Sequence, residues 1–381
     1  MTKRVHSRNS GYYWFVTILM AILPLVTYAP FLSPVNIPLS LFFIAICFTC
    51  YFKIARKPSL ITFLLIFCVV YVGYALLSDK VPNARNSHFG MLNWMLKVQL
   101  AFIPAYYFAS RGFLTLKRLQ LTCIMLFVIF LFGYYLNEQA MQQRTELEDV
   151  TNNSGYLFVS FIPLMFLNFK KNGWLIILSL IMVVLSFKRG AIVCGLVIVF
   201  FSLYYIKREY RVSKAKLFIL ATFVLSAVFA ALSYFLTVNE YAAYRFAQTE
   251  EGNYSGRENY FFDLLNAISD FDAINLFFGK GINYSFRILN NFAHNDWLEL
   301  MTSMGFLGVT LYLFTFWGIW QYSKMLDKNT RIVLYMMMTI LFVKSNVSMS
   351  FFSQSTIPLY YVMGLLMFKP NEKNSRLYRH I

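Results

Sequence analysis

The chain has 381 residues, of which 59% are apolar and 13% are charged, and its formal net charge is +17. Soluble domains carry about 25% charged residues, so the low charged fraction excludes a water-soluble fold and indicates a membrane protein. In a soluble protein the positive charge would favour nucleic acid, whereas in a membrane protein it indicates an excess of Lys and Arg on the cytoplasmic side, and no nucleic-acid partner is expected.

Apolar stretches of roughly the 20 residues that cross a bilayer recur along the whole chain. They cover approximately residues 12–30, 36–52, 60–78, 91–110, 119–136, 155–169, 173–187, 190–206, 216–236, 297–320, 331–348 and 350–368. We predict an all-α, polytopic integral membrane protein with about 12 transmembrane helices, in which residues 1–381 form a single integral-membrane domain. The basic start before the first stretch resembles a signal peptide, but the apolar run is long, so we interpret it as an uncleaved first helix.

The distribution of charge supports this topology. With a cytoplasmic N-terminus, the predicted cytoplasmic segments contain 23 of the 34 Lys and Arg residues and 3 of the 17 acidic residues, a net charge of +20 against −3 elsewhere. Such an excess is typical of the positive-inside rule, and it predicts that both termini are cytoplasmic.

The five cysteines all lie in apolar runs, and Cys47 and Cys50 form a C-x-x-C pattern without a nearby His. We interpret them as small apolar core residues rather than as metal ligands or a redox pair, so no metal site is predicted.

Two adjacent cations, Lys188 and Arg189, occupy a very short outer loop between Ser186 and Gly190, where the positive-inside rule disfavours them. Arg189 would begin a helix, and the unpaired N–H groups of a helix start favour an anion. The pair is therefore either an anchor for lipid headgroups or a site for a phosphate group, which Arg binds through two parallel hydrogen bonds.

The largest soluble segment, approximately residues 237–296, is an outer loop between the ninth and tenth predicted spans, and we expect it to fold back onto the helices. Ser255 and Glu258 fit a capping box, and apolar residues follow at helical spacing. Residues 256–270 should therefore form an amphipathic surface helix with Arg257 in its first turn. Arg257 is either a solvated residue paired with Glu258 or Asp263, or a ligand for an anion.

His294 precedes the tenth predicted span, which Asp296 and Glu299 would open as a D-x-x-E capping box. A position before a helix start disfavours the imidazolium, whereas Asp296 would favour it, so both protonation states remain open. A neutral His294 could act as a general base, and the alternative is a structural role in the loop. His88, beside Arg85 in another outer loop, is the competing histidine.

Several weaker candidates complete the set. Lys280 and Arg287 lie in the long outer loop, and Asn295 follows His294. Lys97 and Lys344 lie within predicted spans, where a charge is a functional candidate unless the side chain reaches the interface.

In their order along the chain, these segments resemble the O-antigen ligase and O-antigen polymerase superfamily of bacterial envelope proteins. The resemblance covers roughly residues 155–320, and it rests on the following motifs: Ser186 to Gly190, Arg257, the Phe-Gly-Lys-Gly turn at 278–281, His294-Asn295 and the Gly-x-x-Gly at 305–308.

The resemblance implies a metal-independent membrane glycosyltransferase without a cofactor, whose donor is a glycan on undecaprenyl pyrophosphate at the periplasmic face of the bacterial inner membrane. Arg189 and Arg257 match the family arginines thought to hold the pyrophosphate, and His294 matches the family histidine near the acceptor. Lys188, Lys280, Arg287, Asn295 and Lys97 are further candidates for binding pyrophosphate or sugar. Phe187 and Lys188 depart from the small or polar residues of many relatives, which bears on the geometry of Arg189.

The implied activity is that of an O-antigen polymerase, which transfers the glycan with inversion to a hydroxyl of another lipid-linked repeat unit. The alternative is an O-antigen ligase that uses lipid A core as acceptor. A lipid-linked oligosaccharide flippase is disfavoured because the unexplained cations gather at the outer face and the chain shows no related halves. Expected partners are membrane lipid, a chain-length regulator and a flippase.

Overall fold

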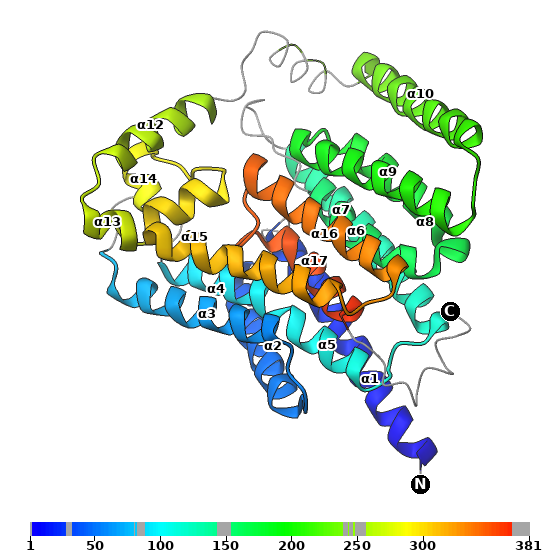
Figure 1. Ribbon diagram of the computed structural model, residues 1–381, viewed down its shortest axis with the longest axis horizontal. Helices are drawn as coiled ribbons and strands as arrows, with labels where there is room; N and C mark the ends of the chain where they lie inside the picture. Colours follow the sequence, from blue (N-terminus) through cyan, green and yellow to red (C-terminus); the bar gives the residue numbers. More distant parts are fainter. Residues whose placement is uncertain are drawn as a thin grey trace.

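The computed structural model describes residues 2–27, 33–79, 81, 88–142, 154–238, 243, 247 and 257–367. All regular elements in these ranges are helices, in agreement with the all-α prediction. Figure 1 shows them as a bundle of long helices with a group of shorter helices, α12 to α14, at one end.

The helices have the following bounds: α1 (Thr2–Ile22), η1 (Leu25–Thr27), α2 (Ser33–Lys53), α3 (Ser59–Leu77), α4 (His88–Leu100), α5 (Phe102–Ser110), α6 (Leu116–Gln142), α7 (Ser154–Met165), η4 (Phe166–Asn168), α8 (Phe169–Leu185), α9 (Arg189–Glu209), α10 (Lys214–Val238), α12 (Arg257–Ser269), α13 (Ala273–Phe278), α14 (Tyr284–Leu289), α15 (Asp296–Ser323), α16 (Lys328–Val347), η5 (Gln354–Thr356) and α17 (Ile357–Leu366).

Seven helical stretches of the described chain are long and apolar enough to cross a bilayer, which identifies an integral membrane protein. They are Pro34–Lys53, Ser59–Leu77, Leu116–Gln139, Ser154–Leu185, Arg189–Glu209, Asp296–Ser323 and Lys328–Val347. Within Ser154–Leu185, Asn168 leaves the helical conformation, and α7 and α8 pack against each other. The total of about 12 spans stays a prediction.

Two predicted spans are irregular. The stretch 91–110 is divided at Ala101 into α4 and α5, and the stretch 350–368 contains an irregular segment, the short η5 and then the ten-residue α17. Every residue of α17 is buried, and the helix packs on α5, α7 and α4 at the centre of the bundle (Figure 1, red). The core therefore forms around a short helix that cannot itself cross a bilayer.

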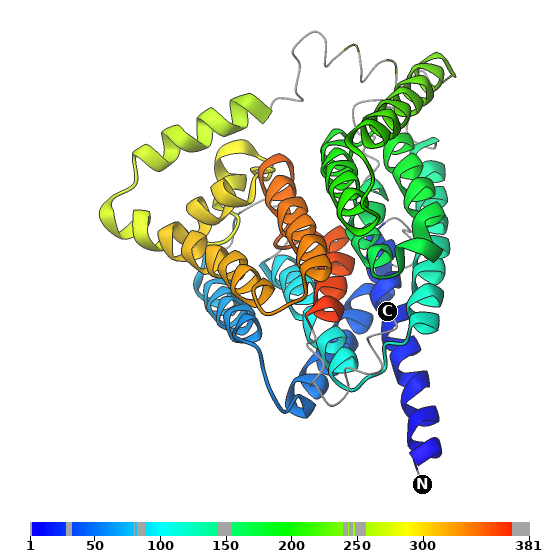
Figure 2. The ribbon, with the colours of Figure 1, turned by 45° about the vertical axis from the view of Figure 1, so that its right-hand side comes forward.

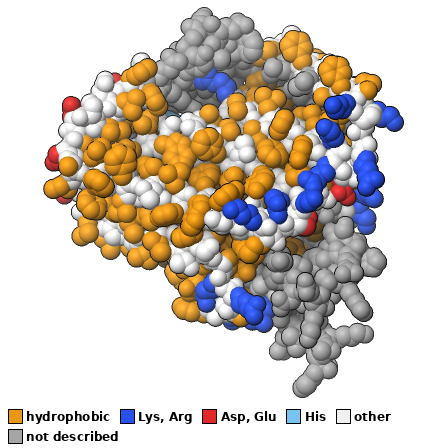
Figure 3. Space-filling model, in the orientation of Figure 1, with side chains coloured by type: hydrophobic (Ala, Val, Ile, Leu, Met, Phe, Trp, Pro, Cys, Tyr) orange, Lys and Arg blue, Asp and Glu red, His pale blue; other side chains and the backbone are white. Residues whose placement is uncertain are grey.

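The helices α12, α13 and α14 gather at one end of the bundle, which we call the loop end (residues 257–289), beside the start of α15 (Figures 1 and 2). Basic residues mark other helix ends, among them Lys53 at the end of α2, Lys207 and Arg208 at the end of α9, and Lys328 at the start of α16. In Figure 3 most of the visible Lys and Arg lie on the right and at the lower edge, and a broad apolar surface lies between the cations on the right and the acidic residues on the left.

Candidate active site

The turn between α8 and α9 presents the two predicted cations at a helix start. Lys188 is the N-cap residue of α9, and Arg189 is its first residue; both side chains are half-buried. The Ser186 hydroxyl donates to the Val183 carbonyl (2.7 Å) and accepts from the Lys188 N–H (3.4 Å), which closes the turn. Phe187 adopts a left-handed conformation with φ 49°, so the turn reverses within two residues.

Gly190 allows close packing directly after Arg189. A Cβ atom at this position would overlap the Tyr156 hydroxyl of α7 and would lie 2.9 Å from Cγ2 of Val347 at the end of α16. The start of α9 therefore contacts α7 and the last residue of α16 without an intervening side chain.

The predicted histidine lies in a second turn, directly before α15. His294 is half-buried and has a left-handed backbone with φ 51°. Asn295 is the N-cap residue of α15, because its side chain accepts from the N–H groups of Trp297 (3.0 Å) and Leu298 (3.1 Å). The prediction that Asp296 caps this helix in a D-x-x-E capping box was therefore wrong, because the N-cap residue is Asn295, one position earlier. Asn295 also donates from Nδ2 to the Asn346 carbonyl of α16 (3.2 Å).

Two fully buried carboxylates hold this turn from within. Glu299 accepts the Ala293 N–H (3.1 Å) and the Ser285 hydroxyl (2.8 Å), which ties the residue before His294 to α14 and α15. Asp296 accepts the Ser350 N–H (2.9 Å) and the Tyr312 hydroxyl (3.2 Å). These residues fix the backbone on both sides of His294, and their acceptor atoms are occupied by protein groups.

The last turn of α16 joins the two predicted segments. Asn346 receives the bond from Asn295, and Val347 packs against Gly190. One turn earlier, the Lys344 amine lies 4.7 Å from the ring centre of Tyr156, whose hydroxyl packs against the same glycine. The Arg189 and His294 segments, more than 100 residues apart, therefore share neighbouring residues of one helix end.

Sequence reasoning missed a buried polar segment, residues 348–356, that follows α16. Asp296 binds its backbone at Ser350, Gln99 of α4 donates to the Phe351 carbonyl (3.0 Å), and Ser160 of α7 donates to the Ser355 carbonyl (2.8 Å). Lys344 donates to the hydroxyls of Ser355 (2.8 Å), Thr356 (2.6 Å) and Ser353 (3.4 Å). Non-helical backbone is tolerated at membrane depth only where protein groups satisfy it, and these side chains do so.

The third predicted segment, around Arg257, is only partly described. Residues 256–270 were predicted to be helical, and α12 confirms this over Arg257–Ser269. Ser255 and Gly256 lie outside the described residues, as do the side chains of Arg257 and Glu258. Two turns after Arg257, Leu264 is fully buried and packs with Ala293 and Leu298, the residues that flank the His294 turn.

The Phe-Gly-Lys-Gly turn at 278–281 and the Gly-x-x-Gly motif at 305–308 lie in contact through their backbones. Gly305 has φ 61° and ψ −155° and interrupts the helical conformation of α15. Carbonyl groups near this interruption accept bonds from the loop, Thr302 from the Lys280 N–H (2.9 Å) and Ser303 from the Gly281 N–H (3.0 Å). The motifs therefore dock the loop end on α15 through backbone contacts that exclude side chains.

The weaker candidates lie in different places. The Lys280 amine is exposed and sits over the rings of Phe271 (4.7 Å) and Tyr284 (5.2 Å). Arg287 is exposed on α14. Lys97 is fully buried in α4 and donates to Oδ1 of Asn36 in α2 (3.2 Å). Because two residues of a helix differ by about 200°, Lys97 lies on the side of α4 opposite Gln99 and points away from the 348–356 segment.

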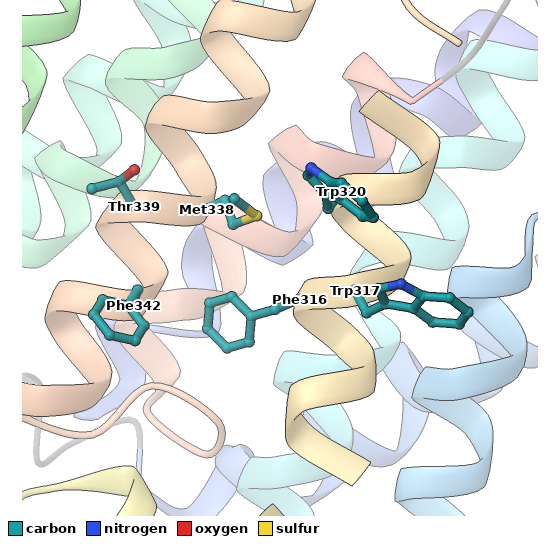
Figure 4. Close-up of a pocket in the computed structure, with 6 residues that line it drawn as sticks. All are labelled: Phe316, Trp317, Trp320, Met338, Thr339 and Phe342. Carbon is teal, nitrogen blue, oxygen red and sulfur yellow. The ribbon is translucent and has the colours of Figure 1, made fainter. Parts of the chain in front are cut away.

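An apolar groove between α15 and α16 leads toward the His294 turn. Phe316, Trp317 and Trp320 line it from α15, and Met338, Thr339 and Phe342 line it from α16 (Figure 4). At the end of the groove that Phe316 and Phe342 form, the Trp297 ring packs on the rings of Phe316 (5.9 Å) and Phe342 (6.0 Å). The groove therefore runs along the membrane-spanning surface and ends three residues from His294.

The described residues contain no group of three or more His, Cys, Asp or Glu side chains placed to hold a metal ion. In a comparison with known families, residues 174–313 match the model described as O-antigen ligase. The matched region runs from α8 into α15 and includes Arg189, Arg257 and His294, but not Lys97 or the 348–356 segment. A search of curated proteins found no match.

Proposed function

We propose that the protein is a metal-independent glycosyltransferase of the bacterial inner membrane that polymerises O-antigen; the match of residues 174–313 to the O-antigen ligase model supports this proposal. Its donor is a glycan on undecaprenyl pyrophosphate, and its acceptor is a hydroxyl of another lipid-linked repeat unit. Catalysis takes place at the loop end, on the periplasmic side. The observation that carries the proposal is the shared end of α16, where Asn346 binds the His294 turn and Val347 packs against the start of α9.

The start of α9 suits a pyrophosphate. Arg189 and Lys188 are half-buried cations at a helix N-terminus, where backbone N–H groups add to the positive potential. Fixed guanidinium groups stabilise the negative charge that develops on a leaving phosphate. Arg257 would complete this site, since α12 packs through Leu264 on the residues that flank the His294 turn.

His294 would act on the acceptor. The acceptor oxygen attacks the anomeric carbon while the bond from that carbon to the phosphate oxygen breaks. The pyrophosphate leaves with the electron pair, the hydroxyl proton passes to His294, and the anomeric configuration inverts. Asp296 and Glu299 hold the turn rather than reacting, because their oxygens are occupied by backbone N–H groups and hydroxyls.

The lipid part of the donor fits the membrane surface beside this site. The groove between α15 and α16 is lined by aromatic and thioether side chains and ends at Trp297. A polyprenyl chain is apolar and flexible, so it can follow such a groove while its pyrophosphate stays near the water boundary.

Deletion of the gene followed by gel analysis of surface polysaccharide tests the proposal. Loss of long chains with a single attached repeat unit is expected for a polymerase. Loss of all attached chains, with lipid-linked polymer accumulating, would instead identify the alternative activity, an O-antigen ligase that uses lipid A core. Normal chain lengths after deletion would contradict both.

Variants returned to the deletion strain test the site. Arg189→Ala, Arg257→Ala and His294→Ala should each abolish long chains at normal expression, whereas Lys207→Ala, an exposed cation at the other end of α9, should restore them. Restoration by all three site variants would refute the assignment. Transfer by the purified protein should also persist in a metal chelator.

A further inference from the structure

The short helix α13 carries an unusual concentration of exposed apolar side chains. Ile274 is 71% exposed, Phe277 59% and Phe278 53%, although α13 has only six residues and none of them is charged. A water-exposed helix does not present its large side chains in this way, so some apolar phase must cover them.

The depth of α13 in the bundle identifies that phase. α3 has 19 residues and rises about 28 Å, close to the hydrocarbon thickness of about 30 Å, so its last turn lies at the membrane boundary. Tyr74, in that last turn, donates to the Phe278 carbonyl (2.7 Å), and Ser78 accepts the Ile282 N–H (3.0 Å). α13 therefore ends at the level of the membrane surface or below it.

α15 gives the same depth independently. Residues 296–304 fold back on the part of α15 that follows Gly305, since the Tyr312 hydroxyl reaches Asp296 (3.2 Å) and the Trp297 ring packs on that of Phe316 (5.9 Å). Residues 306–323 rise about 27 Å, close to the hydrocarbon thickness of about 30 Å, so Gly305 lies near the membrane boundary. A Cβ at Gly305 would lie 2.5 Å from the Phe277 carbonyl carbon. The Phe277 ring also packs on that of Phe306 at 5.9 Å. The backbone of α13 thus lies beside the start of the spanning part of α15, near the membrane boundary.

The exposed face of α13 is continuous with surfaces that face lipid. Phe306 on α15 is 45% exposed, and Leu76 and Leu77 at the end of α3 are also exposed. Both helices belong to the stretches that are long and apolar enough to cross a bilayer. Asn275 is the polar residue of α13, and it is half-buried.

We infer that α13 is embedded in the membrane leaflet at the loop end, with Ile274, Phe277 and Phe278 among the lipid acyl chains. The covering partner is the bilayer itself, and α13 anchors the segment between α12 and α14 at a fixed depth. The turn before α13 contains exposed Asp270 and Asp272, which would remain in water.

Spin labelling of the purified protein in phospholipid vesicles tests the inference without any assay of activity, so it is separable from the proposed function. A label on Ile274→Cys should collide more with oxygen, which partitions into lipid, than with a water-soluble nickel chelate. Leu313→Cys, on the exposed surface of α15, is the lipid-facing reference, and Asp270→Cys, four residues from Ile274, is the aqueous control. The five native cysteines are buried, and the unsubstituted chain measures their background.

The expected result is that the logarithm of the ratio of oxygen to nickel collisions has the same sign at Ile274→Cys as at Leu313→Cys. If the logarithm at Ile274→Cys instead has the sign found at Asp270→Cys, α13 is exposed to water when the protein is in a bilayer, and the inference is overturned. Both labelled sites replace exposed side chains, so the comparison does not depend on a substitution in the core.

Discussion

At the scale of single residues, the two turns of the candidate site share an uncommon backbone. Phe187 and His294 both have positive φ, a conformation that is uncommon for residues other than glycine. Such residues persist where the surrounding structure fixes them, and they are found often at functional sites. Here the fixing groups are the Ser186 hydroxyl for one turn, and Glu299 and Asn295 for the other.

Two substitutions of His294 distinguish the effect of its backbone conformation on stability from the effect of its side chain on catalysis. Asn tolerates a left-handed backbone, so His294→Asn should unfold at nearly the same temperature as the wild type. It lacks a base, so glycosyl transfer should fall by about 10²- to 10⁴-fold. His294→Val should lose the same activity and also unfold at a lower temperature, because a branched residue is strained there. Thermal unfolding and transfer are measured together, and normal transfer by His294→Asn would remove His294 from the mechanism.

Lys344 supports the site from inside the protein. Its amine donates to three hydroxyls of the 348–356 segment, so Lys344→Met should lower the free energy of unfolding by about 1–3 kcal/mol. The same change at the exposed Lys328, at the start of α16, should stay within about 0.5 kcal/mol. Thermal unfolding in detergent measures both. Equal effects would mean that the 348–356 segment does not depend on this amine.

At the scale of elements, glycines decide how the loop end meets the bundle. A Cβ at Gly305 would lie 2.5–2.6 Å from backbone atoms of Phe277 and Leu276, so there is no space for the methyl group of Gly305→Ala. The φ of 61° is also a conformation that alanine disfavours. We expect a loss of about 2 kcal/mol or more, with faster proteolysis of the loop end. Gly73→Ala in α3 meets nothing within 4 Å and should be neutral or stabilising. Similar unfolding temperatures for both variants would contradict this account.

The contact between α9 and α7 allows a double-mutant test. Gly190→Ala should reduce transfer because its methyl group displaces the Tyr156 hydroxyl and shifts the start of α9. Tyr156→Phe removes that hydroxyl oxygen, so the double variant should recover part of the lost transfer. Gly195→Ala on the same helix, where the nearest atom, Cγ1 of Val183, lies 3.2 Å away, is the control. Additive losses in the double variant would show that the two positions do not interact.

The sequence predicted the elements better than their junctions. Hydropathy located the long helices, and helical spacing located α12, because both signals are local. It could not separate the 348–356 segment from a span, since Met349, Phe351 and Phe352 are apolar and the groups that satisfy its backbone come from distant helices. The N-cap at Asn295 was missed for a related reason, because Asp296 is equally suited to cap a helix but is used to bind the Ser350 N–H.

For the whole molecule, the distribution of the net charge of +17 predicts how the protein is oriented in the membrane. The excess of Lys and Arg predicted for the cytoplasmic segments occurs at helix ends such as those of α2, α9 and the start of α16. The loop end carries the acidic residues Asp263, Asp270 and Asp272 with Lys280 and Arg287. Because cytoplasmic loops retain Lys and Arg, this pattern predicts that the loop end, with the candidate site, faces the periplasm.

A maleimide that does not cross the inner membrane tests this orientation in intact cells. Asp270→Cys at the loop end should react, whereas Lys328→Cys at the start of α16 should react only after the membrane is permeabilised. Both positions are exposed and the native cysteines are buried, so a difference reports the side of the membrane rather than burial. The reverse pattern would place Arg189 and His294 in the cytoplasm. Lipid-linked glycans at the periplasmic face could not then reach Arg189 and His294, and the proposed reaction would be excluded.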